Sequence, residues 1–498
     1  MKNKSIYFII GVLLTMLSCK SNDKVSFKPS SITPMQKLLA EKSVKLPNEN
    51  NPVVAYKFGA DPAVLTYKDT VYLYTTNDMQ QFEFSKGKAD NSFDKISSLN
   101  VFYSKDLVNW TNAGEIQVAG KNNPKGVAKW ANNSWAPAVA WKNIDGKDKF
   151  FIYFADNGSG IGVLTSDSPL GPFTDPLGKQ IISRQTPNCA NVTWLFDPAV
   201  LVDDDGNGYL YFGGGHSSNN AEHPKTARCV ALQDDMISIK GTPQEIDAPF
   251  LFEDSGIHKY KDTYYYTYCT NWVDRKKYDT NIPAAVIGYM TSKNPLGPFE
   301  YKGYTLENPG TKLGAWGNNH HWIFSFKDKW YIAYHAQTQE KMLGIKKGGY
   351  RNIYINDFNF NDDLSLPIQK ISKEGVKQIQ NFNPTEKIPA STFAFSRNIA
   401  VSENSVVSVK DNSYFCIKSV EFPNSSCKIK VQYAPNNEKK EVKLQIKSFG
   451  ANGTEIAKIK LNDSGISEAT ITLPEQSLVY DLYFILPQDC EIISWQIM

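Results

Sequence analysis

The chain has 498 residues, a formal net charge of +3 and 13% aromatic residues. This length gives room for two or three domains. The nearly balanced charge, without a basic stripe or a run of Lys and Arg, excludes nucleic acid as an expected partner.

The N-terminal residues predict a targeting segment. An apolar run over residues 6–17 follows two lysines and is too short to span a membrane. The run ends in MLSC, which resembles a bacterial lipobox with Cys19 as the lipidated first residue; an ordinary signal peptide with a chance cysteine is the alternative. We predict a signal peptide over 1–19, a flexible tether over 20–50, and a monomeric lipoprotein of a Gram-negative cell envelope. It would lie in the periplasm or on the outer-membrane surface, and touch the membrane only through its lipid.

A repeated segment indicates the fold of the next 320 or so residues. Four copies are Asp61-Pro62-Ala63-Val64, Asp197-Pro198-Ala199-Val200, Glu253-Asp254-Ser255-Gly256-Ile257 and Asn319-His320-His321-Trp322-Ile323. A fifth copy, Ala136-Pro137-Ala138-Val139, lacks a charged residue at this place. Each copy leads through a polar turn into an aromatic-rich strand. Hairpin repeats of this kind predict a five-bladed β-propeller over 51–375, whose inner strands bring the polar starts to one central cavity.

Near Asn381 the pattern changes. Glycine becomes sparse, and apolar and polar residues alternate over segments such as 428–432 and 442–446. Alternation with period two predicts strands with one buried face, and hence a β-sandwich over 381–498. The expected fold class is all-β, a five-bladed propeller followed by a β-sandwich of the jelly-roll type.

Neither the cysteines nor the acidic run indicate a metal site. The six cysteines after Cys19 show no zinc spacing, and Cys416 and Cys427 are a possible pair across a hairpin. The run over 203–208 resembles a calcium loop but lacks the downstream glutamate of an EF-hand, so a hairpin turn is the better explanation.

Three carboxyl groups fall at the starts of predicted inner strands, on Asp61, Asp197 and Glu253. An Asp-Pro pair can simply cap a turn, but the histidine of the fourth copy at the same place favours a common site. Burial and repulsion push the pKa values of such acids apart. Cleavage of a glycoside needs this arrangement: one carboxylic acid protonates the leaving oxygen, one carboxylate activates water or attacks the sugar, and a third tunes the proton donor.

The motifs around these acids resemble those of glycoside hydrolase family 43. They are WLFDPAVLVDDDGNGYLY over 194–211, FEDSGIHKY over 252–260, NNHH over 318–321 and WYIAYH over 330–335. They occur in the family's order within residues 50–375. The resemblance implies a five-bladed propeller and an inverting enzyme that acts on arabinofuranosyl or xylosyl linkages.

The resemblance also implies roles for individual residues. It makes Asp61 the general base, Glu253 the general acid, and Asp197 the residue that raises the pKa of the acid and orients it. His320, favoured over His321 by register with Asp61, stands where family members hold a metal, commonly calcium, or a water cluster; a purely structural histidine is the alternative. The chemistry itself requires no cofactor.

Three further residues are candidates for binding the substrate, together with His320. Trp135, before the acid-free copy, is placed to wall the sugar pocket, unless it only packs within its blade. Arg351 matches a family arginine that reaches the cavity, with a surface arginine as the alternative. Asp78 ends the first hairpin and is a candidate for hydrogen bonds to sugar hydroxyls.

The C-terminal part resembles carbohydrate-binding module family 6, mostly at core positions such as Phe395, Tyr414 and Trp495. The family's acidic start is replaced by Pro-Ala-Ser over 389–391, and its sugar-stacking loop aromatics are not evident. A role as a packing partner therefore stays open.

The function expected is hydrolysis of α-L-arabinofuranosidic bonds in plant cell-wall polysaccharides or oligosaccharides, with β-xylosidic bonds second. A non-catalytic polysaccharide-binding propeller is an alternative, against which the complete acid set argues. A retaining fructan hydrolase would show Trp-x-Asn-Asp-Pro and Glu-Cys motifs, and both are absent from the sequence.

Overall fold

The structure is a computed structural model that describes residues 31–345, 348–403, 405–435, 440–474 and 477–498. Strands dominate these residues, so the expectation of a mostly β protein is confirmed. The predicted signal peptide and Cys19 lie outside the described residues. Within them, every helix is too short or too polar to cross a membrane.

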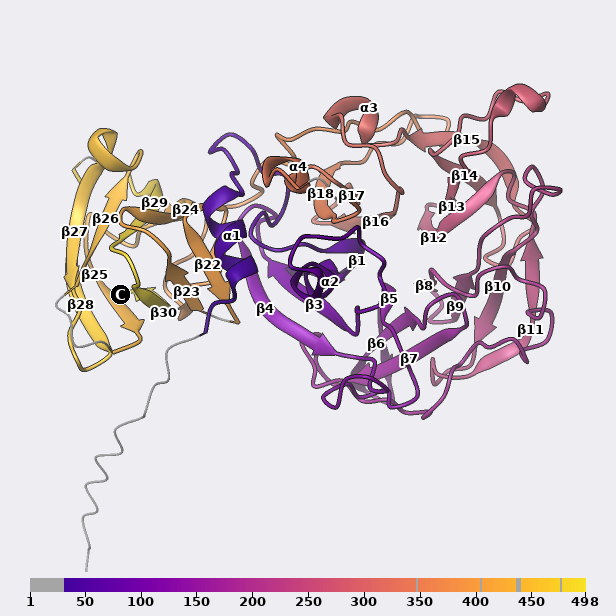
Figure 1. Cartoon of the computed structure of the whole chain (residues 1–498), viewed down its shortest axis with the longest axis horizontal. Helices are drawn as coiled ribbons and strands as arrows, with labels where there is room; N and C mark the ends of the chain where they lie inside the picture. The colour runs from indigo at the N-terminus through magenta and orange to yellow at the C-terminus, as the bar shows by residue number, and fades with distance from the viewer. Residues whose placement is uncertain (1–30, 346–347, 404, 436–439, 475–476) are drawn as a thin grey trace, which may run out of the picture.

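Five antiparallel sheets follow one another along the described part of the chain before residue 358 (Figure 1). Their strands are β1 (Ala60–Tyr67), β2 (Thr70–Thr76), β3 (Ser98–Ser104) and β4 (Trp110–Gln117); β5 (Trp135–Ile144), β6 (Lys147–Ala155) and β7 (Ile161–Ser166); β8 (Ala199–Val202), β9 (Gly208–Phe212), β10 (Ala227–Leu232) and β11 (Ile239–Ile246); β12 (Leu251–Tyr260), β13 (Thr263–Thr270), β14 (Ile287–Ser292) and β15 (Glu300–Leu306); and β16 (His321–Phe326), β17 (Lys329–Ala336) and β18 (Asn352–Asp357). The first strand of each sheet contacts that of the next, and β16 contacts β1. These first strands therefore close a ring, which brings their distant starts together.

Buried side chains between neighbouring sheets hold the ring together. Phe151 and Leu210 belong to one cluster between the second and third sheets, and Tyr211 and Tyr266 to one between the third and fourth. Because both faces of such a sheet are covered, its strands are nearly continuous apolar runs rather than alternating ones. Residues 203–207 of the acidic run form the hairpin turn between β8 and β9, which begins at Gly208.

Backbone from before β1 joins the last sheet. The N–H of Gly59 donates to the carbonyl of Arg351 at 2.9 Å. The buried Asn51 side chain donates to the carbonyl of Ile355 at 3.0 Å and accepts from its N–H at 2.9 Å. These bonds fix β18, and with it Arg351, beside the start of β1.

Helix α1 (Pro34–Lys42) lies within the segment predicted as a flexible tether, and from Pro34 on the structure differs from that prediction. Thr33 and Gln36 form a capping box that starts the helix. Leu39 packs into a cluster of the five-sheet ring, and Ala40 packs against the C-terminal part. The capped helix therefore docks between the two parts of the chain. Short helices α2 (Asp78–Ser85), α3 (Gly310–Leu313) and α4 (Gln339–Met342), none of them predicted, lie in loops of the ring.

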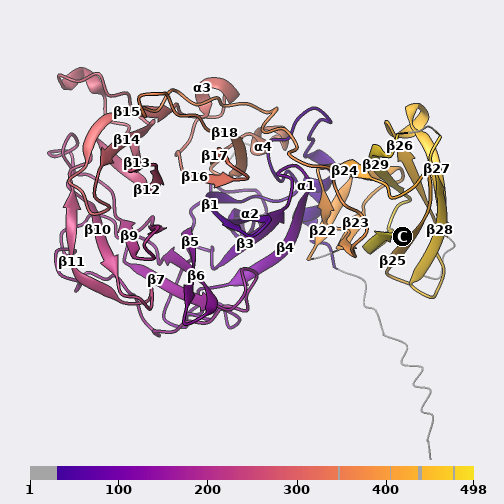
Figure 2. The ribbon, with the colours of Figure 1, turned by 180° about the vertical axis from the view of Figure 1, so that it is seen from behind.

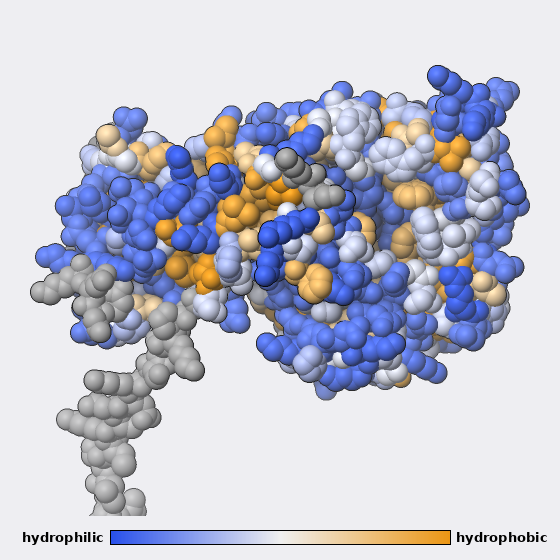
Figure 3. All heavy atoms as spheres, viewed as in Figure 1, coloured by the Kyte–Doolittle hydropathy of each residue, from blue (hydrophilic) through white to orange (hydrophobic). Residues whose placement is uncertain are grey.

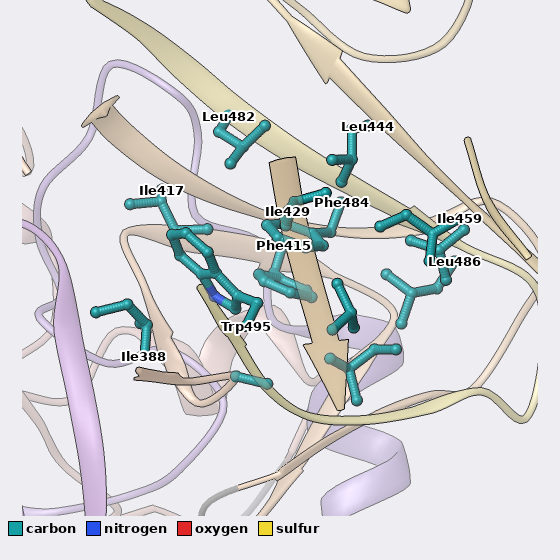
Figure 4. Packing of buried hydrophobic residues seen from close by; sticks show 14 of the residues in the cluster. Ile388, Phe415, Ile417, Ile429, Leu444, Ile459, Leu482, Phe484, Leu486 and Trp495 are labelled. Carbon is teal, nitrogen blue, oxygen red and sulfur yellow. The ribbon is translucent and has the colours of Figure 1, made fainter. Parts of the chain in front are cut away.

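Two further sheets make up the described C-terminal part. One contains β21 (Phe395–Arg397), β24 (Ser413–Glu421), β29 (Val479–Leu486), β26 (Glu441–Ile446) and β27 (Thr454–Lys460); the other contains β22 (Ile399–Ser402), β23 (Ser405–Ser408), β30 (Glu491–Ile497), β25 (Ser426–Tyr433) and β28 (Ile466–Thr472), with β19 (Ile388–Pro389) beside β30. Between them lies an apolar core in which Phe415 stacks on Phe484 near Trp495 (Figure 4). Cys416 and Cys427 are buried free thiols on different sheets, so the suggested disulfide is wrong.

The C-terminal part is joined to the first sheet through β20 (Thr392–Phe393), which pairs with β4 beside Thr111. Asn109 and Lys418 exchange two hydrogen bonds across this seam, of 2.8 and 3.0 Å. The two parts lie side by side in both ribbon views (Figures 1 and 2). Hydrophobic residues on the face in Figure 3 gather near the seam, while most of that face is hydrophilic.

Candidate active site

A cavity of about 240 Å³ lies where the starts of the five first strands meet. It is lined by Asp61, Thr76, Phe93, Trp135, Ala136, Asn157, Gly158, Trp194, Phe196, Asp197, Phe252, Glu253, Asn318, His320 and Arg351. Six of these residues were predicted from the sequence: Asp61, Trp135, Asp197, Glu253, His320 and Arg351. The cavity therefore combines three carboxyl groups with aromatic walls.

A shared backbone conformation presents the residues at the start of four first strands. Asp61, Ala136, Asp197 and Asp254 all have positive φ angles, of 50°, 40°, 47° and 69°. In the first, second and fourth sheets this residue lies in a bulge between the first and second strands. In the fourth sheet Asp254, rather than Glu253, thus occupies the place of Asp61. The sequence alignment of Glu253 with Asp61 was wrong by one residue, because two acids stand in a row and the bulge leaves no sequence signal.

Asp61 is held as a carboxylate. Nη1 of Arg351 donates to its Oδ1 at 2.8 Å, and Nδ1 of His335 and of His320 lie 3.3 and 3.5 Å from the same oxygen. Burial by itself raises the pKa of Asp61, but the charge of Arg351 and the two histidines outweigh it and hold the pKa well below its usual range. A buried carboxylate of this kind suits a general base.

Glu253 is held in the opposite state. Burial raises its pKa well above the usual range, and the nearby carboxyl groups of Asp197 and Asp61 raise it further. Its Oε1 is buried with no hydrogen-bond partner among the described residues. Burial and Asp61 likewise raise the pKa of Asp197. Burial and the neighbouring carboxyl groups therefore favour the protonated form of Glu253, which suits a proton donor.

Arg351 links the cavity to Asp78. Its Nε and Nη2 donate to the two carboxylate oxygens of Asp78 at 2.9 and 2.8 Å. Asp78 is fully buried and does not line the cavity. The prediction that Asp78 binds sugar hydroxyls is therefore replaced by a role in holding Arg351, because both of its oxygens face the guanidinium group.

His320 lines the cavity, whereas His321 lies fully buried behind it. Nε2 of His320 lies 3.2 Å from Oδ1 of Asp254, and its Nδ1 lies 3.5 Å from Asp61 and 3.8 Å from Asp197. Nδ1 of His321 lies 2.5 Å from Oδ2 of Asp254. Asp254 thus fixes both histidine rings, and its backbone N–H donates to Oδ2 of Asp197 at 2.8 Å.

The sequence predicted a metal or a water cluster at His320. Within the described ranges, no group of three or more His, Cys, Asp or Glu side chains is arranged to hold a metal ion. Because Asp254 engages Nε2 of His320, that nitrogen is not open to a metal. Nδ1 of His320 faces Asp61 and Asp197, so a metal or a water cluster held by this histidine stays a prediction.

Several residues in or beside the cavity were not identified from the sequence. Trp194 and Phe196 precede Asp197, and the alternation in WLFD is a signal that places them on one face. Asp254 would have been found by matching Asp254-Ser255-Gly256 to Asp61-Pro62-Ala63. Phe93 comes from the loop between β2 and β3, where no pattern marks it.

Two carboxyl groups that share one sugar-sized cavity, with pKa values shifted in opposite directions, match the base and acid of a glycoside hydrolase. The family model of glycosyl hydrolases family 43 matches residues 49–364. The chain belongs to this family.

Several known proteins are similar to this chain over most of its length. An arabinoxylan arabinofuranohydrolase of Paenibacillus polymyxa is 42% identical over 463 residues, which are 89% of this chain and 72% of that protein. Another of Bacillus subtilis is 44% identical over 432 residues, which are 83% of this chain and 82% of that protein. The crystal structure of a family 43 arabinoxylan arabinofuranohydrolase from Bacillus subtilis in complex with cellotetraose has a TM-score of 0.86 and 40% identity, and covers 92% of this chain and 99% of that one.

Proposed function

We propose that this enzyme removes α-L-arabinofuranosyl substituents from arabinoxylan by a single displacement with inversion. The observation that carries the proposal is that Asp61, paired with Arg351, and the buried Glu253 line one cavity, with their pKa values shifted in opposite directions. The substrate class rests on the names of the two relatives that are 42% and 44% identical over most of the chain.

In this proposal Asp61 and Glu253 carry the proton transfers. A water molecule attacks the anomeric carbon and gives a proton to Asp61 as the new carbon–oxygen bond forms. The bond from that carbon to the leaving oxygen breaks, and this oxygen takes the proton of Glu253. Asp197, held by the N–H of Asp254, raises the pKa of Glu253 and helps to orient it.

The other residues at the cavity bind and position. Arg351 keeps Asp61 charged and lies over the ring of Phe93, with its Cζ 5.0 Å from the ring centroid. Nε1 of Trp135 donates to the carbonyl of Phe93 at 3.0 Å, which fixes its indole as a wall for the sugar ring. β-Xylosidic bonds remain the alternative substrate, because both sugars fit the same acid pair.

We also propose the domain organisation and location expected from the sequence. The five sheets would be the blades of a propeller over 51–375, and the last two sheets a β-sandwich over 381–498. This C-terminal part resembles carbohydrate-binding module family 6. The pairing of β20 with β4 supports a role for it as a packing partner of the first sheet. A signal peptide and a lipid on Cys19 would anchor a monomer in the cell envelope.

The test compares substrates with the purified protein. Nitrophenyl α-L-arabinofuranoside and arabinoxylan should both release arabinose, at higher kcat/KM than nitrophenyl β-xyloside releases xylose. Proton NMR of the first product should show the inverted anomer. Release of xylose alone would show that the enzyme is a β-xylosidase and not an arabinofuranosidase. A first product with retained anomeric configuration would contradict the roles of Asp61 and Glu253.

A further inference from the structure

Arg351 reaches the cavity from an irregular segment of the chain. Residues 348–351 belong to no helix or strand and lead directly into strand β18. A side chain on an irregular segment is held less precisely than one on a strand or helix. The backbone that carries Arg351 therefore needs fixed partners of its own.

The carboxyl group of Glu340 holds the backbone just before Arg351. Its Oε2 accepts a hydrogen bond from the N–H of Tyr350 at 2.9 Å, and the N–H of Gly349 donates to the same carboxyl group. Gly348 is close as well, because a Cβ added there would lie 3.3 Å from Oε1 of Glu340. Glu340 belongs to α4 and is buried. One buried acid thus contacts three successive residues of the segment.

Asp78 extends this arrangement by one residue. The N–H of Arg351 donates to Oδ2 of Asp78 at 3.1 Å. The N–H groups of residues 349–351 are therefore bound by two buried carboxyl groups, which come from the separate helices α2 and α4. Unlike Arg351, Glu340 does not line the cavity, so it acts on the site through the backbone that it binds.

The carbonyl groups of the same segment are bound by the loop before Phe93. The N–H of Asn91 donates to the carbonyl of Gly348 at 2.9 Å, and its side chain donates to the carbonyl of Gly349 at 3.0 Å. The ring of Tyr350 is fully buried, and its hydroxyl donates to the carbonyl of Ala89 at 2.9 Å. With the N–H groups bound by Glu340 and the carbonyl groups bound by this loop, the segment has one defined position.

We propose that Glu340 is a positioning residue of the active site, which binds the backbone before Arg351 and so keeps the guanidinium group in contact with Asp61. The contact between Nη1 and Oδ1 is 2.8 Å long, a distance typical of a charge-assisted hydrogen bond. A misplacement of about 1 Å in an active site can cost roughly 100-fold in rate. The proposal rests on the proposed function, because that function makes Asp61 the general base.

The variants Glu340→Ala and Glu340→Gln test this role. Ala removes both hydrogen bonds to the segment, whereas Gln keeps an oxygen that accepts one of them. We expect Glu340→Ala to lose roughly 10- to 100-fold in kcat/KM on nitrophenyl α-L-arabinofuranoside. The loss should lie mainly in kcat, because the base and not the sugar is mispositioned, and Glu340→Gln should recover most of it.

A double-mutant cycle with Arg351→Met decides whether Glu340 acts through Arg351. In the Arg351→Met protein, Glu340→Ala should cost about twofold or less, because the side chain that it positions is absent. An equal loss in both backgrounds would overturn the proposal. The matched control is Asp235→Ala: Oδ1 of Asp235 also accepts two backbone hydrogen bonds, from Ile237 and Ser238, but in the turn between β10 and β11. This control should leave kcat/KM unchanged.

Exchange of backbone amide hydrogens tests the same contact without turnover. In Glu340→Ala, a peptide that covers residues 348–352 should exchange about tenfold faster than in the wild type, and in Asp235→Ala at the wild-type rate. Glu340→Asp, whose carboxyl group is withdrawn by one methylene, replaces the Ala variant if that protein does not fold. A wild type that leaves arabinofuranosides intact refutes the proposed function. Unchanged exchange in the Glu340 variant overturns the positioning role, whether or not the wild type is active.

Discussion

The guanidinium group of Arg351 bridges two buried carboxylates, with Nη1 2.8 Å from Asp61 and Nη2 2.8 Å from Asp78. One cation thus serves both the cavity and the packed interior behind it. Asp78 holds the arginine in place, and the arginine keeps Asp61 ionised. The charge of the proposed base therefore depends, through Arg351, on Asp78, which does not line the cavity.

Replacing Arg351 by Met should move the acid limb of the pH profile. Without this cation, burial dominates and the pKa of Asp61 rises, so Asp61 becomes a carboxylate only at higher pH. In kcat/KM against pH for nitrophenyl arabinofuranoside, we expect the acid limb to shift upward by at least one pH unit, since removal of a buried charge partner changes a pKa by about 1–3 units. Arg397→Met, at an exposed site of the C-terminal part, is the control and should leave the profile in place.

Replacing Glu253 by Gln should abolish most of the turnover of natural substrates. Loss of a general acid costs about 10²- to 10⁴-fold. We expect a loss of this size on arabinoxylan and a clearly smaller one on an arabinofuranoside with a dinitrophenyl leaving group, which needs no proton. In the wild-type enzyme the same raised pKa should appear as the basic limb of the profile, because activity falls as Glu253 loses its proton. Equal losses on the two substrates would count against Glu253 as the acid.

Replacing Asp254 by Asn should lower kcat while KM stays near its wild-type value. Asn keeps the backbone N–H that holds Asp197 but replaces one of the two carboxyl oxygens that face His320 and His321 by an amide N–H₂ group. Loss of the partner of a buried polar group costs about 1–3 kcal/mol, which corresponds to roughly 5- to 150-fold in kcat. Steady-state kinetics on arabinoxylan measures this, and Asp204→Asn, in an exposed hairpin turn, is the control. An unchanged kcat would assign Asp254 to folding alone.

The same Glu253→Gln variant should be more stable than the wild type at neutral pH. Because the pKa of Glu253 is raised in the folded state, the folded protein holds a proton that the unfolded chain releases above about 4.5. Stability is then lost as pH rises above that value and until the folded pKa is reached. Gln carries no such proton, so its gain in Tm should be small at pH 4 and larger at pH 8 in a calorimetric scan. A gain that is the same at both pH values would contradict the raised pKa.

Much of this architecture was readable from local sequence. The strands and the acids at their starts were predicted because each repeat carries its own alternation, turn and polar start. The place of Asp254 was missed because a bulge adds a residue without changing composition. The docking of α1 was missed because Leu39 and Ala40 are buried by partners far away in the sequence. Asp78 was assigned to sugar binding because a pattern cannot tell an acid that faces a cavity from one that faces a buried arginine.

The pairing of β20 with β4 also has a consequence for protein engineering. In a protein truncated before residue 392, strand β4 at the outer edge of the first sheet would lose its neighbour β20. Trp110 of β4, which is now almost entirely shielded from water, lies on that edge. Uncovered strand edges with large apolar side chains recruit other chains. The catalytic part produced alone is therefore expected to aggregate unless that edge is redesigned with charged residues.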